Sequence, residues 1–240
     1  MMRFWVAGAT GYTGSAFVRE ARAAGHDVIA HVRPGSASEE RARGAFEPLG
    51  AVVDTTAWMV DPLRDRLRAE RVDAVLCLIG TTRKRGLAEG MKGTEMYDKV
   101  DYGLTAMLVS AAAASGTRPC FVYLSAMGVR EDARSPYMRA RWKAETAVRN
   151  SGLPFVIARP GFISGSDREE RRPAERVGAV VADGLLAMAG VLGARQLRDT
   201  YRSMDATTLA RALLSAATDP NARHQVLEAD SLRMRAGATG

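Results

Sequence analysis

The feature that most constrains the fold is a glycine-rich segment near the start of the chain, Gly8-Ala9-Thr10-Gly11-Tyr12-Thr13-Gly14. It joins an apolar segment, residues 3–7, which we predict to be a strand, to an alanine-rich segment that we predict to be a helix to about residue 24. Glycines at such a turn allow a tight bend and a close approach of the backbone to a pyrophosphate, and the helix N-terminus favours phosphate. We therefore predict a dinucleotide-binding loop, with contacts from Gly8, Thr10, Gly11, Tyr12, Thr13 and Gly14. Its spacing, G-x-x-G-x-x-G, departs from the usual G-x-G-x-x-G.

Strands and helices alternate along the chain to about residue 160. Further strands are predicted at 27–32, 51–53, 73–79, 119–124 and 155–158, and further helices from Asp61 as N-cap, at 99–115 and at 135–150 with Ser135 as cap. This alternation predicts the α/β class, as a doubly wound parallel sheet of the Rossmann type. A helix at 205–217, capped by Asp205, is expected to pack back on the core, with a last strand at 225–228. We expect one domain over 1–240: a dinucleotide-binding core over 1–160 and a small C-terminal substrate or cap region over 161–240.

The charge balance is basic, with 34 Lys and Arg against 27 Asp and Glu and a net charge of +7. The arginines are spread along the chain and often stand beside acids, as in Arg64-Asp65-Arg66, which is typical of a solvated surface. Net charge bears on solubility and non-specific binding rather than on fold. We therefore expect no nucleic-acid partner, and an anionic small-molecule ligand would suit the positive field.

Cysteine and histidine are too few for a disulfide framework or a dedicated zinc site. The two cysteines indicate a reducing compartment, and the three histidines lie far apart without ligand spacing, so no metal is expected. No signal peptide is apparent, and we expect a cytoplasmic protein. The apolar stretch 177–194 reaches the minimum spanning length but holds Asp183 and four glycines. We expect a buried helix, a pocket wall or a subunit interface there rather than a membrane span.

The end of the second predicted strand distinguishes the two nicotinamide cofactors. An acid at this place hydrogen-bonds a free ribose 2′-hydroxyl, whereas an arginine accommodates a 2′-phosphate. The strand ends His31-Val32-Arg33, without an acid, and Arg33 can hold a phosphate bidentately. NADP (NADPH) is therefore predicted in preference to NAD. The alternative is an ordinary surface arginine at a strand end.

Several motifs together resemble those of the atypical and extended short-chain dehydrogenase/reductases, most closely the Tat-interacting-protein-like and NmrA-like NADP-binding members. They are Val6–Gly14, Leu78–Arg83, Val100-Asp101-Tyr102, Leu124–Gly128 and Arg159-Pro160-Gly161. The resemblance covers nearly the whole chain, more loosely after residue 165. It implies that Asp54 and Thr55 flank the adenine. It also implies that the ribose is lined by Ile79, Gly80 and Thr81, and that the nicotinamide is bordered by Pro160 and Gly161.

The same family uses a Tyr-x-x-x-Lys pair with a serine for proton exchange. A tyrosine has an ordinary pKa of about 10, so it needs a nearby cation that favours the phenolate if it is to exchange a proton at neutral pH. Tyr137 stands on a predicted helix with Arg141 four residues later, on the same face. Arginine keeps the charge and could donate to the ribose, but it cannot relay a proton. Ser125 is present, although the following residue, Ala126, has no hydroxyl. The predicted catalytic residues are Tyr137, Arg141 and Ser125, and the first two are also expected to contact the cofactor.

These observations favour an NADP(H)-dependent oxidoreductase that transfers hydride between nicotinamide and a small carbonyl or quinone-like substrate. Two alternatives stay open. One is a non-catalytic NADP(H)-binding sensor, which the departures at Arg141 and Ala126 favour. The other is a sugar-nucleotide epimerase or dehydratase, for which the segment after residue 165 is short. A homodimer is compatible with any of the three.

Overall fold

Seven parallel strands form one sheet in the order β3-β2-β1-β4-β5-β6-β7. The computed structural model describes residues 1–80, 95–161, 163 and 204–237, so Thr81 and the stretch 177–194 lie outside the described residues. The strands are β1 (Arg3–Ala7), β2 (Asp27–His31), β3 (Val52–Asp54), β4 (Ala74–Cys77), β5 (Cys120–Leu124), β6 (Phe155–Arg159) and β7 (Gln225–Glu228). The predicted α/β class and doubly wound parallel sheet are confirmed.

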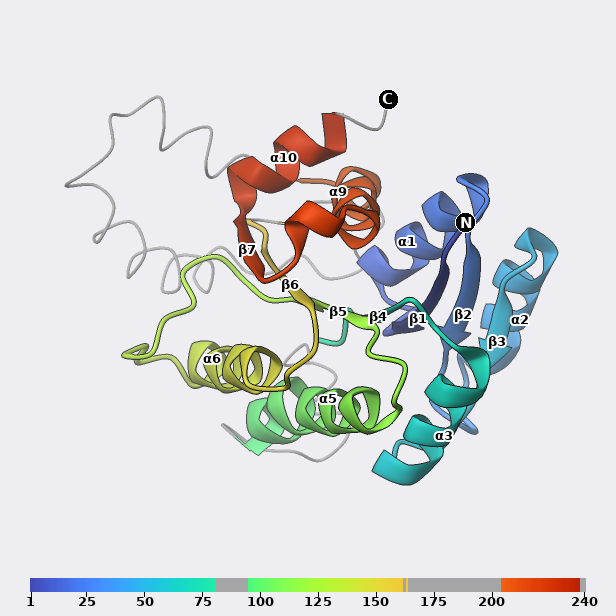
Figure 1. Cartoon of the computed structure of the whole chain (residues 1–240), viewed down its shortest axis with the longest axis horizontal. Coiled ribbons are helices and arrows are strands. Elements are labelled where there is room, and N and C mark those ends of the chain that lie inside the picture. The colour runs from blue at the N-terminus through green and yellow to red at the C-terminus, as the bar shows by residue number, and fades with distance from the viewer. Residues whose placement is uncertain (81–94, 162, 164–203, 238–240) are drawn as a thin grey trace.

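The helices form a layer on each face of this sheet (Figure 1). One layer holds α1 (Tyr12–Ala23), α2 (Glu39–Phe46), α9 (Ala206–Thr218) and α10 (Ala229–Gly237). The other holds α3 (Val60–Glu70), α5 (Leu104–Ala114) and α6 (Pro136–Arg149). Helix α9 lies against α1, where Arg211 pairs with Glu20 at 2.9 Å. The division of the chain at residue 160 stays a prediction.

Strand β1 lies inside the sheet, between β2 and β4, and is fully buried beyond its first residue. Because side chains alternate along a strand, Phe4 and Val6 join the core on the α1 and α9 side, and Trp5 and Ala7 join the core on the α3 and α5 side. In register, Ala7 lies opposite both His31 of β2 and Cys77 of β4. The carboxyl ends of these strands therefore meet at one edge of the sheet, where ligands of such folds bind.

Local structure differs from the sequence expectation at several places. Helix α3 begins at Val60 and its N-cap is Met59, so Asp61 lies in the first turn and is not the cap. The helix expected at 99–115 is divided into a π-helical turn, η2 (Tyr97–Gly103), and α5. Helices α2 and α10 were not expected. Asp205 does cap α9, because its carboxylate accepts the Thr208 amide at 2.8 Å.

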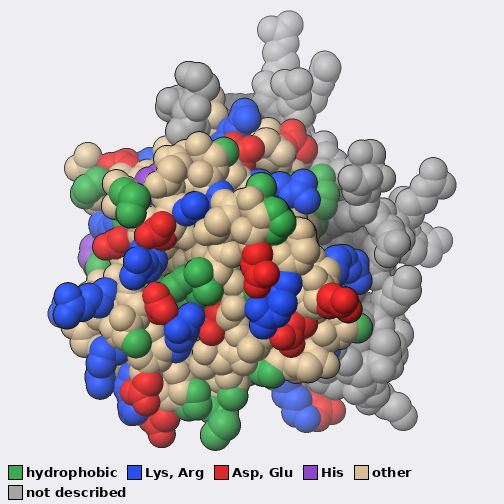
Figure 2. Space-filling model, turned by 90° about the vertical axis from the view of Figure 1, so that its right-hand side faces the viewer, with side chains coloured by type: hydrophobic (Ala, Val, Ile, Leu, Met, Phe, Trp, Pro, Cys, Tyr) green, Lys and Arg blue, Asp and Glu red, His purple; other side chains and the backbone are tan. Residues whose placement is uncertain are grey.

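The surface carries both signs of charge side by side. On the face in Figure 2, Lys and Arg side chains are interspersed with Asp and Glu, with only scattered hydrophobic groups. This arrangement agrees with the solvated surface inferred from sequence. In the part of the chain that the structure describes, no helix is long and apolar enough to cross a membrane.

Candidate functional site

The glycine loop follows β1 directly and runs into α1, as the sequence predicts. Gly8 has a φ of +79°, and a Cβ there would lie 2.8 Å from the Leu78 carbonyl oxygen of the β4 end. A Cβ on Gly14 would overlap the Gly8 carbonyl oxygen and lie 2.9 Å from the Ala9 Cα. The Gly11 amide closes the turn on the Gly8 carbonyl at 2.9 Å. Only glycine therefore allows this close packing of loop, helix and strand.

The start of α1 has the properties of a phosphate site. Gly11 is the N-cap, no side chain caps the helix, and the first turn holds no acid. Thr10 and Gly11 are exposed at the turn, whereas Thr13 and Gly14 are buried beneath it. Tyr12, the first residue of α1, is half-buried. A helix start without a carboxylate is open to an anionic ligand.

The ends of β2 and β3 lie side by side at the same edge. Val32 donates its amide to the Asp54 carbonyl at 2.9 Å, and the next residue, Arg33, is exposed. The buried Asp54 carboxylate accepts Trp5 Nε1 at 3.0 Å and Thr56 Oγ1 at 2.8 Å. Its oxygens thus bind the protein's own donors. The adenine contact that the resemblance implies for Asp54 and Thr55 stays a prediction.

An aromatic cluster lies below these strand ends and was not expected from the sequence. The His31 ring lies 4.9 Å from the Trp5 ring and 5.0 Å from the Trp58 ring, and its Nε2 lies 2.8 Å from the Thr56 carbonyl oxygen. Burial holds the pKa of His31 below its ordinary value, because the uncharged ring is favoured there. His31 is therefore a buried strand residue whose ring packs against Trp5 and Trp58.

The end of β4 connects the glycine loop to helix α6. Leu78 approaches Gly8, and the next two residues approach Arg141: the Ile79 carbonyl lies 3.4 Å from its Nη2, and a Cβ on Gly80 would lie 2.8 Å from the same atom. Ile79 is half-buried and Gly80 exposed. The loop, the β4 end and α6 are thus contiguous along one edge of the sheet.

Tyr137 and Arg141 lie on one face of α6, as their spacing predicts. The Arg141 guanidinium carbon lies 5.2 Å from the centre of the Tyr137 ring, and Tyr137 is half-buried whereas Arg141 is buried. Tyr97 of the η2 turn contacts the same ring edge-on at 5.5 Å. The predicted tyrosine–cation pair is therefore present as a contact.

The hydrogens on both Nη atoms of Arg141 are directed to protein acceptors. Nη1 donates to Leu124 O at 2.7 Å and to Tyr123 Oη at 3.1 Å. Nη2 lies 2.9 Å from Asp101 Oδ1 and 3.4 Å from Ile79 O. Burial disfavours the charge, but Tyr123, Tyr137 and Asp101 outweigh it and raise the pKa of Arg141. The guanidinium is a permanently charged group held by three segments of the chain.

Ser125 follows β5 and is buried. Its hydroxyl donates to Glu145 Oε1 at 2.6 Å, and Glu145 also accepts Arg159 and Arg149. Burial alone would raise the pKa of Glu145, but the hydrogen bonds from these three residues lower it below its ordinary value. The Ser125 hydroxyl thus donates its hydrogen bond to an ionised carboxylate, and its predicted catalytic role stays a prediction.

Pro160 and Gly161 follow β6 next to this network. The Pro160 carbonyl accepts the Met127 amide at 3.0 Å, which ties the segment after β5 to the segment after β6. Pro160 is buried and Gly161 half-buried. Both lie at the carboxyl edge, as the resemblance implies, and their place beside a nicotinamide stays a prediction.

Asp101 is a residue of this site that sequence reasoning missed. It lies in the η2 turn, its side chain is fully buried, and it pairs with Arg141. The sequence did contain a pointer to Asp101: it is the acid of the Val100-Asp101-Tyr102 motif, and a buried cation such as Arg141 requires a nearby anion. Its partner could not be chosen without the fold, since 40 positions separate the two residues.

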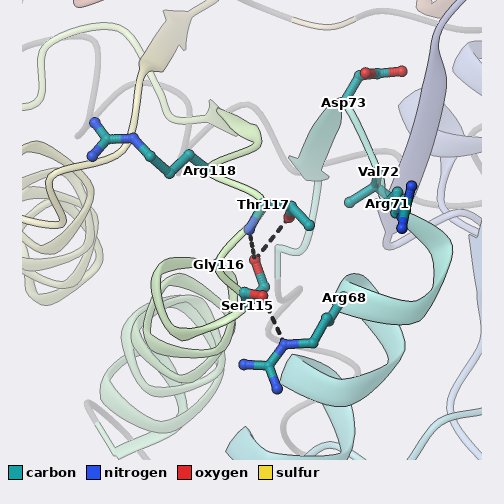
Figure 3. A pocket seen from close by; sticks show the side chains of 8 residues that line it. All are labelled: Arg68, Arg71, Val72, Asp73, Ser115, Gly116, Thr117 and Arg118. Carbon is teal, nitrogen blue, oxygen red and sulfur yellow. Dashed lines mark hydrogen bonds between the residues drawn. The ribbon is translucent and has the colours of Figure 1, made fainter.

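A separate hollow of about 530 Å³ lies at the opposite edge of the sheet, before β4 and β5 (Figure 3). Arg68 donates to the Ser115 and Ala114 carbonyls at the end of α5, and Arg118 donates to the Gly152 carbonyl. These arginines cap backbone carbonyls on different sides of the hollow rather than converge in it. The hollow is therefore distinct from the candidate site.

Comparison with known families identifies the class. An NAD(P)H-binding family matches residues 8–191, which is most of the chain. The chain belongs to this family and is an NAD(P)H-binding protein with a Rossmann-type parallel sheet. The resemblance inferred from the sequence is confirmed at the level of an NAD(P)H-binding Rossmann protein.

The chain is similar to several fungal proteins. It is 35% identical to protein fmp52-1, mitochondrial, of Aspergillus terreus over 138 residues, which is 57% of this chain and 54% of that protein. It is 28% identical to protein FMP52, mitochondrial, of Candida albicans over 70% of each chain. The chain thus spans about half the length of the first of these relatives. The expectation of a cytoplasmic protein is contradicted, because the relatives are named as mitochondrial proteins.

Solved structures share the fold at low identity. A putative NAD-dependent epimerase/dehydratase from Bacillus halodurans has a TM-score of 0.67 at 18% identity, covering 94% of this chain and 92% of that one. Triphenylmethane reductase from Citrobacter sp., complexed with NADP(H), has a TM-score of 0.61 at 18% identity, covering 95% of this chain and 69% of that one.

Among the described residues, no group of acids, histidines and cysteines is arranged to hold a metal ion.

Proposed function

We propose that this protein is an NADP(H)-dependent oxidoreductase of the atypical short-chain dehydrogenase/reductase type, acting on a small carbonyl or quinone-like compound. The observation that carries the proposal is the continuity of the site. Gly8 packs against the segment after β4, that segment contacts Arg141, and the Arg141 guanidinium packs against the Tyr137 ring. A dinucleotide held by the glycine loop would extend along this edge toward the Tyr137 hydroxyl.

The residues at this edge suit a dinucleotide. The glycine loop approaches so closely that a side chain is excluded at Gly8 and Gly14, and the start of α1 carries no acid. The loop would hold the pyrophosphate, Arg33 the 2′-phosphate, and the segments after β3, β4 and β6 the adenine, ribose and nicotinamide. When bound, NADPH supplies hydride. The part of the protein is to orient the acceptor and to hold or take a proton at Tyr137 Oη.

A non-catalytic NADP(H)-binding sensor is the second candidate. It is favoured by the Arg141 and Ser125 contacts, because Nη1 and Nη2 of Arg141 and the Ser125 hydroxyl already donate to protein acceptors. Tight cofactor binding without turnover of any acceptor would support it. No contact among the described residues favours a sugar-nucleotide epimerase or dehydratase.

Replacing Arg33 with alanine tests the choice of cofactor. NADPH affinity is expected to fall by about tenfold or more, whereas NADH affinity changes by less than about twofold, because only NADPH carries the 2′-phosphate. Fluorescence titration of both cofactors measures the effect. Arg43→Ala is the control, since Arg43 lies on α2 and pairs with Glu39 and Glu47. Equal affinities of the unchanged protein for NADPH and NADH would refute the NADP assignment.

Replacing Tyr137 with phenylalanine tests the reaction. The ring and its contacts with Arg141 and Tyr97 remain, so NADPH affinity is expected to stay within about twofold, while turnover falls by about 100-fold through loss of the proton-exchanging hydroxyl. The loss of NADPH absorbance with a panel of carbonyls and quinones measures turnover. Tyr102→Phe is the control, because it removes a hydroxyl from a tyrosine of the neighbouring η2 turn whose ring faces Lys143. Unchanged turnover of Tyr137→Phe on every accepted compound would exclude the tyrosine mechanism.

A further inference from the structure

The ion pair between Asp101 and Arg141 lies next to the proposed proton-exchanging residue, because the Arg141 guanidinium carbon is 5.2 Å from the centre of the Tyr137 ring. Nη2 and Oδ1 are 2.9 Å apart, and the two side chains are 0% and 6% exposed. Removing two charges from water is costly unless they are paired and hydrogen-bonded. A pair this deeply buried is therefore held in a defined geometry by its surroundings.

Arg141 joins three segments that come from different parts of the sheet edge. Its guanidinium bonds the Leu124 carbonyl at the β5 end, the Ile79 carbonyl after β4, and Asp101 in the η2 turn. Gly80 leaves the space that the guanidinium occupies, since a Cβ there would lie 2.8 Å from Nη2. One side chain thus joins the ends of β4 and β5 to the η2 turn.

The η2 turn contacts Tyr137 in two ways. Tyr97 packs edge-on against its ring at 5.5 Å, and Asp101 holds the guanidinium that lies 5.2 Å from the ring centre. A π-helical turn is often found at functional sites, and here it places Tyr97 and Asp101 toward the same residue. The direction of the Tyr137 hydroxyl therefore depends on the turn as well as on α6.

We propose that Asp101 is a positioning residue, which fixes Arg141 so that the guanidinium orients the Tyr137 ring and the ends of β4 and β5. In this arrangement Arg141 acts from within the protein and does not donate to the cofactor. The inference rests on the proposed function, in which Tyr137 exchanges the proton. It differs from the role that the resemblance implies for Arg141, which is a contact with the ribose.

A second ion pair between the same two elements provides a matched control. Asp98 of η2 lies 2.8 Å from Lys143 of α6, with half of each side chain exposed. Asp98→Asn and Asp101→Asn make the same chemical change in the same turn. If Asp101 merely holds η2 to α6, Asp101→Asn should lower the melting temperature more than Asp98→Asn, because its pair is buried, but should leave the Tyr137 environment unchanged.

The direct test is fluorine NMR of protein labelled with 3-fluorotyrosine, with the Tyr137 signal assigned by Tyr137→Phe. Asp101→Asn is expected to broaden or shift the Tyr137 signal, whereas Asp98→Asn leaves it unchanged. In turnover assays with the best acceptor of the panel, Asp101→Asn is expected to lose about tenfold in kcat while the Kd for NADPH stays within about twofold. An unchanged Tyr137 signal in Asp101→Asn would overturn the proposal.

A charge-free double variant separates positioning from stability. Arg141→Met alone leaves a buried carboxylate without its cation, so a lower melting temperature is expected. Asp101→Leu with Arg141→Met removes both charges and is expected to recover the melting temperature but not the wild-type Tyr137 signal or kcat. A tenfold rise of the NADPH Kd in this folded double variant would overturn the proposal, because it would make Arg141 a cofactor contact.

The outcomes also separate this inference from the proposed function. Failure of the unchanged protein to bind NADPH would refute the proposed function, while the fluorine signal of Tyr137 would still report on Asp101. Conversely, tight NADPH binding with Tyr137-dependent turnover and no response to Asp101→Asn would leave the function and refute the positioning role.

Discussion

Replacing Gly14 with alanine is expected to weaken NADPH binding by roughly 100-fold, or about 2.7 kcal/mol. The added Cβ would overlap the Gly8 carbonyl oxygen and press on Gly8 C at 2.8 Å and Ala9 Cα at 2.9 Å. All three are backbone atoms, so no side-chain rotation relieves the contact and the loop itself must move. Overpacking of this kind is also expected to lower the free energy of unfolding by about 1–3 kcal/mol. Fluorescence titration and urea unfolding measure the two effects.

Gly44→Ala is the matched control for this change. Gly44 lies inside α2, and a Cβ there meets nothing within 4 Å. Alanine is expected to stabilise the protein by about 0.5–1 kcal/mol, because glycine is unfavourable within a helix. NADPH affinity should be unaltered. If Gly14→Ala bound NADPH as tightly as the unchanged protein, the glycine loop would not be the phosphate site.

The fold was predictable because its signals are local and periodic. Apolar segments bounded by glycine or proline marked the strands, and the alternation of strands with helices required parallel connections. Asp205 was recognisable as a cap from its place before an amphipathic helix. The start of α3 was misjudged, because an Asp-Pro pair also suits the first turn, and here the helix begins at Val60.

The candidate site was predictable only where it is local. The glycine loop and the Tyr137–Arg141 spacing each lie within one short segment, and each appears as expected. The partners of Arg141 and Ser125 are distant in sequence, because Asp101 and Glu145 reach them across the sheet edge. Which acid pairs with which donor depends on the tertiary structure. The sequence therefore could not show that Arg141 and Ser125 already bind protein acceptors.

Replacing Glu145 with alanine is expected to lower the free energy of unfolding by about 3–5 kcal/mol. The Glu145 side chain is fully buried and accepts Ser125 Oγ at 2.6 Å, Arg159 Nη2 at 2.7 Å and Arg149 Nη2 at 2.8 Å. The change leaves two arginines and a buried hydroxyl without their shared acceptor. It should also free the ends of β5 and β6, which this carboxylate links through Ser125 and Arg159. Urea unfolding measures the loss.

Glu228→Gln is the control, because Glu228 pairs with the same Arg159 at 3.1 Å but is more than half exposed. An exposed pair contributes less than about 1 kcal/mol, so this variant should unfold nearly as the unchanged protein does. Equal losses for Glu145→Ala and Glu228→Gln would show that the buried carboxylate has no special role.

The same carboxylate predicts how stability depends on pH. The pKa of Glu145 is lower in the folded chain than its ordinary value of 4.5, so the unfolded chain binds the proton more tightly. The stabilisation from Glu145 is therefore complete above about pH 4.5 and is lost as the pH falls from there through the folded pKa. Below this range the unchanged protein and a Glu145→Gln variant should converge in stability, whereas at pH 7 they should differ. A difference that stayed constant from pH 7 to pH 3 would mean that the ionised form of Glu145 is not what holds Ser125 and Arg159 in place.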